Sequence, residues 1–216
     1  MIDRSLGLAG LVLLGLVAAS SAANAFTRTE QREPCAEQDP QRRPFFGDLH
    51  VHTSFSFDSY TSGQRNDPTA AYAYAKGAPI QLPAVDGSQS VTAQLRRPLD
   101  FAAVTDHAEF LGEMNTCTTD ASSLAYWSPH CMLTRSGIFY GQLIAAGYWA
   151  EHVMEDANPK TRSYIYRWFP ERCARGVAEF WNEIQRAAEG AYDRTRSCRF
   201  TSFIGYEYTD TPNSNN

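Results

Sequence analysis

Three short apolar segments, each ending in polar residues, constrain the fold of this chain more than any other feature. The segments cover residues 45–52, 99–105 and 200–208, and stretches with helical spacing separate them. Short apolar runs of this kind are typical of buried strands, and strands that alternate with helices pair in parallel. The sequence therefore predicts an α/β fold with a parallel sheet.

The stretches between these segments carry helix and turn signals. Asp67 and Pro68 form an N-cap followed by proline at the first helical position, so a helix is expected from there to Gly77. Residues 79–97 contain turn signals that predict a loop or a small hairpin, and the polar stretch 116–134 is expected to be a surface insertion. Apolar spacing predicts further helices over residues 135–156, 161–169 and 171–192.

The first residues have the pattern of an export signal. Residues 6–19 form an apolar run, and Ala23-Asn24-Ala25 fits the small-x-small rule of signal peptidase. The alternative is an uncleaved membrane anchor, but the run is short for a span of about 20 residues. We therefore expect cleavage near Ala25 and a periplasmic or secreted protein without stable membrane insertion. The expected parts are a signal peptide at residues 1–25, an extended leader at 26–43 and a domain at 44–216.

Charge narrows the range of partners. The chain has 216 residues, a formal net charge of −5 and no run of like charges. Proteins that bind along nucleic acid carry a basic patch, and the sequence predicts none here. We expect a small-molecule substrate rather than nucleic acid, and the oligomeric state is left open.

Five cysteines favour an oxidising compartment. No CxxC pair is present, which argues against a thiolate zinc site. Pairing of neighbours along the chain predicts disulfides between Cys117 and Cys131 and between Cys173 and Cys198. Cys35 is then left over, either as a free thiol or with a partner elsewhere.

The polar residues at the ends of the three predicted strands are of the types that bind metal ions. His50 and His52 are two residues apart, so their side chains leave a strand on the same side, and Asp48 lies one step deeper to orient an imidazole. His107 directly follows the second predicted strand, and Glu207 lies at the end of the third. Because parallel strands present their carboxyl ends at one edge of a sheet, these side chains should meet. The sequence therefore predicts a metal site there.

The motifs at these strand ends resemble those of a known superfamily. Residues 48–56 (DLHVHTSFS), 104–107 (VTDH) and 204–207 (IGYE) are similar to the first three motifs of the PHP (polymerase and histidinol phosphatase) superfamily. The longer strings PFFGDLHVHTSFSFDSY and GYEYTDTPNSNN resemble its exported bacterial branch, called domain of unknown function 3604. The resemblance extends over residues 44–216.

The resemblance implies a distorted (β/α)7 barrel that holds two or three divalent metals. By that resemblance, His50 and His52 hold the first metal, and Glu207 bridges it to a second. Asp58 and His107 would serve a third. Imidazole and carboxylate ligands suit Zn, Mn or Fe and do not select among them.

Two further expectations concern the completeness of the fold and the role of Asp106. The family completes its cluster with histidine and aspartate residues on later strands, but no histidine follows His152 in this sequence. We therefore expect a partial barrel with helical insertions, the N-terminal part of a longer protein. Asp106 is expected to orient His107 rather than to bind metal itself.

The implied activity is metal-dependent hydrolysis, most simply of a phosphoester by hydroxide that the metals generate from water. Arg65 and Lys76 are weak candidates for holding a phosphate, and a role as solvated surface charge is the simpler interpretation. An alternative is a non-catalytic, exported binding protein with an incomplete metal site. Hydrolysis of a C–N bond at a similar site also stays open.

Other chemically suggestive residues have simpler interpretations. His130 and His152 are expected at the surface, and Tyr60 at the mouth of the site. Ser54 and Ser56 lack the spacing of a Ser-His-Asp triad. Four aromatic residues are expected in the core rather than in a substrate platform: Trp149, Trp168, Phe180 and Trp181.

Overall fold

The computed structural model describes residues 34–37, 43–82, 90–154 and 163–209, together with two single residues, Arg32 and Gln41. All of the described helices and strands belong to the compact unit that spans residues 33–216. The predicted signal peptide at residues 1–25 and most of the leader at 26–43 lie outside the described residues. Both therefore stay predictions.

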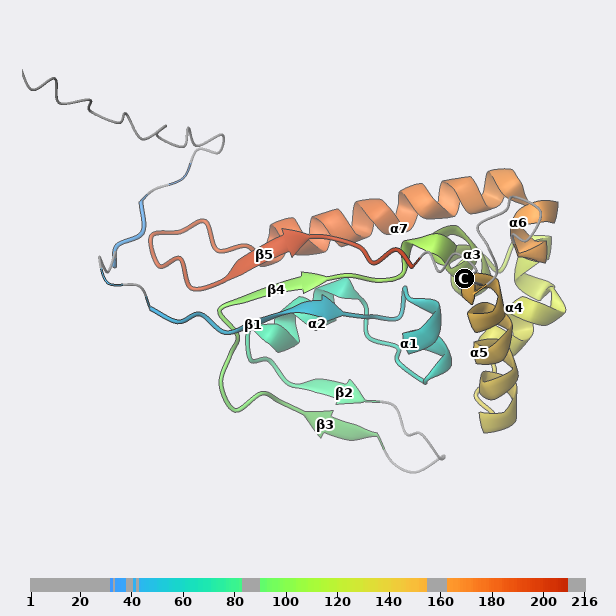
Figure 1. The fold of residues 1–216 in the computed structure, drawn as a ribbon, viewed down its shortest axis with the longest axis horizontal. Coiled ribbons are helices and arrows are strands. Elements are labelled where there is room, and N and C mark those ends of the chain that lie inside the picture. Colours follow the sequence, from blue (N-terminus) through green and yellow to red (C-terminus); the bar gives the residue numbers. More distant parts are fainter. Residues whose placement is uncertain are drawn as a thin grey trace, which may run out of the picture. The chain divides into compact units, whose positions relative to one another are not determined.

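A parallel sheet of three strands forms the centre of the fold (Figure 1). Its strands are β1 (Gly47–Val51), β4 (Phe101–Val104) and β5 (Thr201–Ile204), in the order β1-β4-β5. Both neighbouring pairs run parallel, with Phe101 of β4 opposite Gly47 and Thr201. The predicted α/β fold with a parallel sheet is confirmed. The described strands form an open sheet rather than a closed barrel, so the partial barrel stays a prediction.

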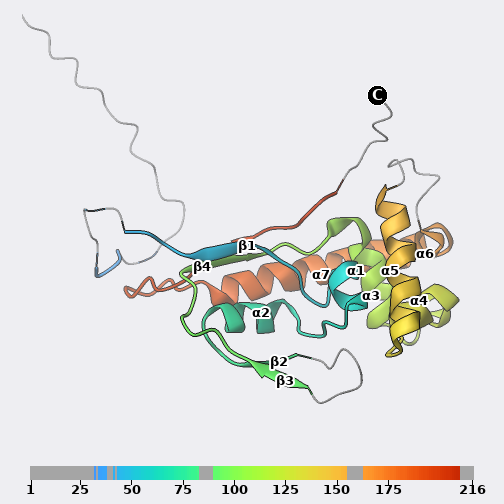
Figure 2. The same cartoon turned by 60° about the horizontal axis from the view of Figure 1, so that its bottom comes forward.

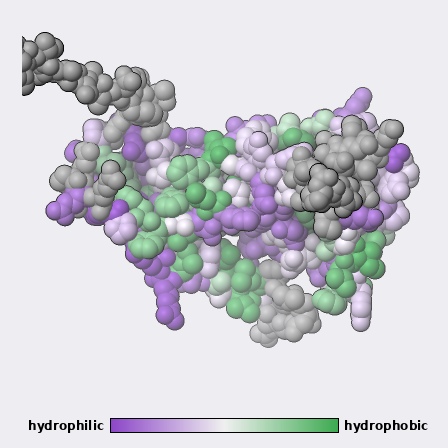
Figure 3. All heavy atoms as spheres, viewed as in Figure 1, coloured by the Kyte–Doolittle hydropathy of each residue, from purple (hydrophilic) through white to green (hydrophobic). Residues whose placement is uncertain are grey.

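Two helices cover one face of this sheet, as Figures 1 and 2 show: α2 (Pro68–Ala75) and α7 (Pro170–Ala191). Tyr72 of α2, Val104 of β4 and Ala188 of α7 belong to one buried cluster. The hydroxyl of Ser202 donates to the carbonyl of Ala188, so Ser202 faces α7. Phe203 therefore points to the opposite face, where 47% of it is exposed. On the face seen in Figure 3, apolar residues gather over the strands of the sheet.

The helix α2 forms where the sequence predicts it. The Asp67 side chain accepts a hydrogen bond from the main-chain N–H of Ala70 at 2.8 Å, as an N-cap does. Gly77 follows the helix with φ +93°, a conformation that glycine adopts without strain. The hairpin predicted within residues 79–97 is confirmed as the antiparallel pair β2 (Ile80–Leu82) and β3 (Val91–Ala93).

The remaining elements form a helical part between β4 and β5, preceded by the short α1 (Phe57–Thr61). Along the chain these are η1 (Ala108–Phe110), α3 (Leu111–Thr118), η2 (Leu124–Trp127), α4 (Pro129–Thr134), α5 (Phe139–Met154) and α6 (Tyr164–Trp168). The three helices predicted at 135–156, 161–169 and 171–192 correspond to α5, α6 and α7.

Part of the predicted surface insertion at 116–134 is buried instead. Cys117, Ala125, Cys131 and Thr134 have no exposed surface, and the first three belong to the main buried cluster. Thr119 and Ser122 of this stretch are exposed, while a disulfide between Cys117 and Cys131 holds its inner side together. The composition of this stretch does not indicate its buried side, because the residues buried there are small or contain sulfur rather than being large and apolar.

The main core lies between α1, the helical part and α7. The rings of Phe55 and Phe180 stack at 3.6 Å, and Trp149 is fully buried. Trp149 and Phe180 are therefore core residues, as predicted, and Trp181 packs against the core while partly exposed. The prediction for Trp168 is wrong, since 70% of it is exposed. The helix α6 has five residues, and Ile165 is the one that it buries.

The two disulfides join Cys35 to Cys198 and Cys117 to Cys131. The predicted Cys117–Cys131 bond is confirmed, whereas the predicted Cys173–Cys198 bond is wrong. Cys173 is buried in α7 and takes no part in a disulfide, and Cys35 is bonded rather than left over. Among the described residues, no helix combines the length and apolar character needed to cross a membrane.

Candidate metal centre

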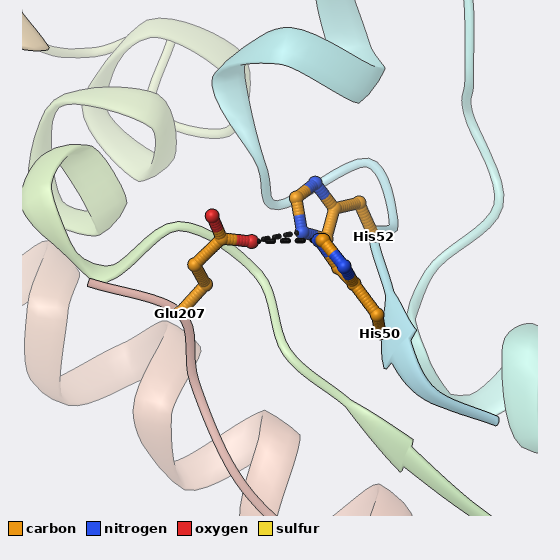
Figure 4. Close-up of side chains that lie close together, drawn as sticks. All are labelled: His50, His52 and Glu207. Carbon is orange, nitrogen blue, oxygen red and sulfur yellow. Dashed lines mark hydrogen bonds and ion pairs between the residues drawn. The ribbon is translucent and has the colours of Figure 1, made fainter. Parts of the chain in front are cut away.

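Two imidazoles and a carboxylate meet at the carboxyl ends of the strands (Figure 4). His50 lies near the end of β1, His52 follows that strand, and Glu207 follows β5. The Nε2 atoms of His50 and His52 each lie 2.8 Å from the same oxygen, Oε2 of Glu207. Sequence positions 155 residues apart therefore share one contact point.

A second group of side chains adjoins the first and shares His52 with it. The Nδ1 atom of His52 lies 2.9 Å from Oδ2 of Asp58, a residue of α1. His107, which follows β4, places its Nε2 3.8 Å from Oδ2 of Asp58 and 4.0 Å from Oε1 of Glu207. All five predicted ligands thus lie together.

The spacing of these atoms fits divalent cations. Nitrogen and oxygen ligands bind Zn²⁺ at about 2.0–2.2 Å, so two ligands of one ion lie roughly 3–4 Å apart. Within each of the two groups, the available ligand atoms all lie within 4.8 Å of one another. His50, His52 and Glu207 would hold one ion, and Asp58 and His107 are placed for another. The mixed nitrogen and oxygen donors suit Zn, Mn or Fe alike.

Main-chain pairing beyond the regular strands brings these ligands together. His107 and Glu207 form an isolated parallel bridge past the ends of β4 and β5. The N–H of Glu207 donates to the carbonyl of Asp106 at 3.1 Å, and the N–H of Ala108 donates to the carbonyl of Glu207 at 2.8 Å. On the other side of the sheet, the register between β1 and β4 shifts between Asp48 and Val51. Backbone pairing therefore holds the segments that carry His107 and Glu207 side by side.

Asp106 anchors the end of β1 rather than the ring of His107. Its fully buried carboxylate accepts the main-chain N–H of Thr53 at 2.5 Å and the hydroxyl of Thr53 at 2.8 Å. Burial raises the pKa of Asp106 to about 6, although the two bonds from Thr53 oppose the rise. Because Thr53 follows His52 directly, Asp106 secures the position of that ligand. The sequence predicts that Asp106 orients His107, but the hydrogen bonds of its side chain go to Thr53 instead.

Charge and hydrogen bonding shift the pKa values of His52 and Asp58 in opposite directions. The hydrogen bond to Asp58 raises the pKa of His52 to about 9, against the lowering effect of burial. Burial alone would raise the pKa of Asp58, but hydrogen bonds from His52 and Ser56 outweigh it and lower that pKa. The hydroxyl of Ser56 donates to Oδ1 of Asp58 at 2.5 Å, and the N–H of Ser59 donates to the same atom at 2.6 Å. Asp58 is thus held as a carboxylate.

Comparison with protein families decides where this chain belongs. The model of the family described as "Protein of unknown function (DUF3604)" matches residues 39–216. The chain belongs to the DUF3604 family. No curated protein and no solved structure matches it.

The residues at the candidate centre of this DUF3604 chain include one that the motifs did not point to. Glu109 of η1 lies beside His107, with its carboxylate 3.4 Å from Nδ1 of that ring. Burial alone would lower the pKa of His107. The hydrogen bond with Glu109 and the negative charges of Glu109, Asp58 and Glu207 together outweigh burial and raise that pKa. The available signal was an acidic residue two positions after a strand-end histidine, within the apolar stretch that Phe110 and Leu111 continue.

Several other candidates lie elsewhere or make local contacts in the DUF3604 chain. The exposed carboxylate of Asp48 accepts the main-chain N–H of His50 and does not orient an imidazole. Arg65 stacks on the ring of Tyr60 at 3.8 Å and donates to the carbonyl of Tyr60. Lys76 follows α2 and donates to the carbonyl of Ala191, the last residue of α7. The helix α2 ends near the amino end of β4, whereas the candidate centre lies at the carboxyl end of that strand.

The two remaining histidines lie in the helical part. The ring of His130 packs 4.4 Å from that of Tyr148 and 5.6 Å from that of Tyr164. His152 packs against the other side of the same tyrosine, at 4.4 Å. Both histidines are half-buried in an aromatic cluster rather than fully at the surface, which corrects the prediction in part. Neither belongs to the ligand groups of the DUF3604 centre.

Proposed function

We propose that this protein is an exported, metal-dependent hydrolase of the PHP superfamily type, acting as a phosphoesterase on a small molecule. The observation that supports it is the shared contact of His50 and His52 with Oε2 of Glu207, at 2.8 Å each. This cluster of imidazoles and carboxylates lies at the carboxyl ends of parallel strands, and α/β folds bind their ligands at these ends. Two disulfides are consistent with export, since such bonds persist in oxidising compartments.

Two or three divalent ions of Zn, Mn or Fe would supply the chemistry, by lowering the pKa of water toward about 7 and neutralising charge on a phosphoryl oxygen. The chain's own residues hold and orient the site. Asp58 accepts the Nδ1–H of His52, which leaves Nε2 of His52 toward Glu207 and His50. The side chain of His50 is 72% exposed, so a small substrate reaches the site from solvent.

The first test measures metal content and hydrolysis in the same preparation. Protein prepared with Zn²⁺ and Mn²⁺ is analysed for metal content by inductively coupled plasma mass spectrometry. The same protein is assayed for hydrolysis of p-nitrophenyl phosphate and bis-p-nitrophenyl phosphate. His52→Asn and Glu207→Gln should weaken metal binding by at least the roughly 10–100-fold that loss of an outer partner costs, and should abolish hydrolysis. The matched control is His130→Asn, since His130 lies outside both ligand groups.

The results separate the possible roles. If the wild-type protein takes up no divalent metal, the proposal is wrong. Metal uptake without hydrolysis of any phosphoester would favour the non-catalytic binding role instead. If His130→Asn lost metal to the same extent as His52→Asn, the loss would not report on the candidate centre.

A further inference from the structure

A buried carboxylate adjoins the candidate ligands without being one of the motif residues. The side chain of Glu109 is 10% exposed, as is that of His107. Its Oε1 atom accepts the main-chain N–H of Thr209 at 2.6 Å. Its Oε2 atom is buried and has no hydrogen-bond partner. Removing a carboxylate oxygen from water is unfavourable unless a nearby cation or donor offsets it, so Glu109 requires a counter-group.

The ring of His107 is that counter-group. Its Nδ1 atom lies 3.4 Å from both carboxylate oxygens of Glu109. Its Nε2 atom faces the other way, 3.8 Å from Oδ2 of Asp58 and 4.0 Å from Oε1 of Glu207. An imidazole that donates from Nδ1 to a carboxylate keeps the lone pair of Nε2 for a metal ion. The side of His107 that faces the other ligands is thus the metal-binding side.

Glu109 also holds the segment that carries Glu207. Thr209 gives its N–H to Glu109 and its hydroxyl to Oε1 of Glu207, the latter at 3.2 Å. One carboxylate therefore contacts His107 after β4 and the backbone two residues beyond Glu207 after β5. We propose that Glu109 is a positioning residue that orients His107 and Glu207 toward a divalent metal ion. This inference rests on the metal site of the proposed function.

The chain offers a matched control for this role. Glu113 lies four residues later in α3, is 2% exposed, and accepts the hydroxyl of Ser163 at 3.0 Å. It lies outside both ligand groups. Replacing either glutamate by glutamine exchanges a buried carboxyl group for an amide of the same size. Glutamine at position 109 also keeps a carbonyl oxygen for the N–H of Thr209, so the segment after β5 stays anchored.

The experiment compares Glu109→Gln with Glu113→Gln in two measurements other than activity. Zn²⁺ affinity is measured by competition with a chromogenic chelator, and the absorption bands of Co²⁺ at saturation report ligand geometry. Glu109→Gln should bind Zn²⁺ about 10–100-fold more weakly than the wild type and shift the Co²⁺ bands. Glu113→Gln should lower the melting temperature and leave both metal measurements unchanged. Glu109→Asp, which keeps the charge but withdraws it from His107, should also weaken binding.

Each outcome decides between the roles. Wild-type affinity and an unchanged Co²⁺ spectrum in Glu109→Gln would overturn the inference, as would equal metal losses in Glu109→Gln and Glu113→Gln. If Glu109→Gln does not fold, wild-type affinity in Glu109→Asp overturns it and weakened affinity supports it. A wild-type protein that binds no metal would end the proposed function and this inference together. Metal binding that depends on Glu109 without hydrolysis would support the inference and remove only the activity.

Discussion

His52 is the residue that both candidate ligand groups share. Its Nε2 lies 2.8 Å from Glu207 and its Nδ1 lies 2.9 Å from Asp58. A neutral imidazole has one lone pair and one N–H, so it binds one ion and donates once. Because Asp58 is held as a carboxylate by Ser56, it is the natural acceptor of that N–H. A single proton on His52 therefore decides whether its Nε2 can bind metal.

This proton gives a testable pH dependence. Without metal, the hydrogen bond to Asp58 raises the pKa of His52 to about 9, so His52 carries both protons at pH 7. Metal binding must then expel the Nε2 proton, and the apparent Zn²⁺ affinity should rise with pH up to about 9, by about tenfold per pH unit for each proton released. Calorimetric titrations in buffers of different ionisation enthalpy count the released protons.

The variant His52→Asn tests whether the released proton comes from His52. On binding Zn²⁺, this variant should release at least one proton fewer per ion than the wild type. His130→Asn is the control, since burial lowers the pKa of His130 and leaves that ring neutral at pH 7. Equal proton release in the wild type and in both variants would contradict the assignment to His52.

At the scale of elements, the strand ends could be predicted because two local rules agree. Side chains two residues apart on a strand point the same way, which places His50 beside His52. Parallel strands then bring His107 and Glu207 to the same edge of the sheet, as the structure shows. The helix α2 could also be predicted, from its N-cap at Asp67. The metal role of these side chains stays a prediction.

Features that depend on distant packing could not be read from the sequence. Glu109 becomes notable only when η1 packs beside the segment that holds Thr209, 100 residues later. The Cys35–Cys198 bond spans 163 residues, and pairing of neighbours along the chain favoured Cys173 instead. Apolar spacing does not determine which aromatic residues a short helix buries. The prediction that Trp168 lies in the core is wrong for this reason.

The attachment of α2 to the sheet depends on one buried hydroxyl. Tyr72 Oη accepts the N–H of Val104 at 3.1 Å and donates to the carbonyl of Phe203 at 2.8 Å. Tyr72→Phe leaves the buried N–H of Val104 and the part-buried carbonyl of Phe203 without that partner, which should lower the free energy of unfolding by about 1–3 kcal/mol. Urea denaturation measures the loss. Tyr74→Phe, at a more exposed position of the same helix, should cost less, and an equal loss in both variants would contradict this role.

At the scale of the whole molecule, a covalent link joins the segment before the sheet to the loop before β5. Cys35 is bonded to Cys198, and the N–H of Ala36 donates to the carbonyl of Arg196 at 2.8 Å. Cys198 has φ +45°, in the left-handed region that residues other than glycine rarely adopt. The neighbouring Asp193 carboxylate accepts the hydroxyls of Thr195 and Ser197 and the N–H of Arg199, which fixes the loop.

This link predicts both a disulfide map and a stability effect. Digestion without reduction should release a peptide pair that contains Cys35 and Cys198, and a pair that contains Cys173 would contradict the structure. The bond closes 163 residues, so it restricts the unfolded chain strongly, and Cys35→Ser with Cys198→Ser should lower the free energy of unfolding by about 2–4 kcal/mol. Zn²⁺ affinity serves as the internal control and should not change, because neither cysteine belongs to the ligand groups. Weaker metal binding in this double variant would mean that the link also positions β5, and with it Glu207.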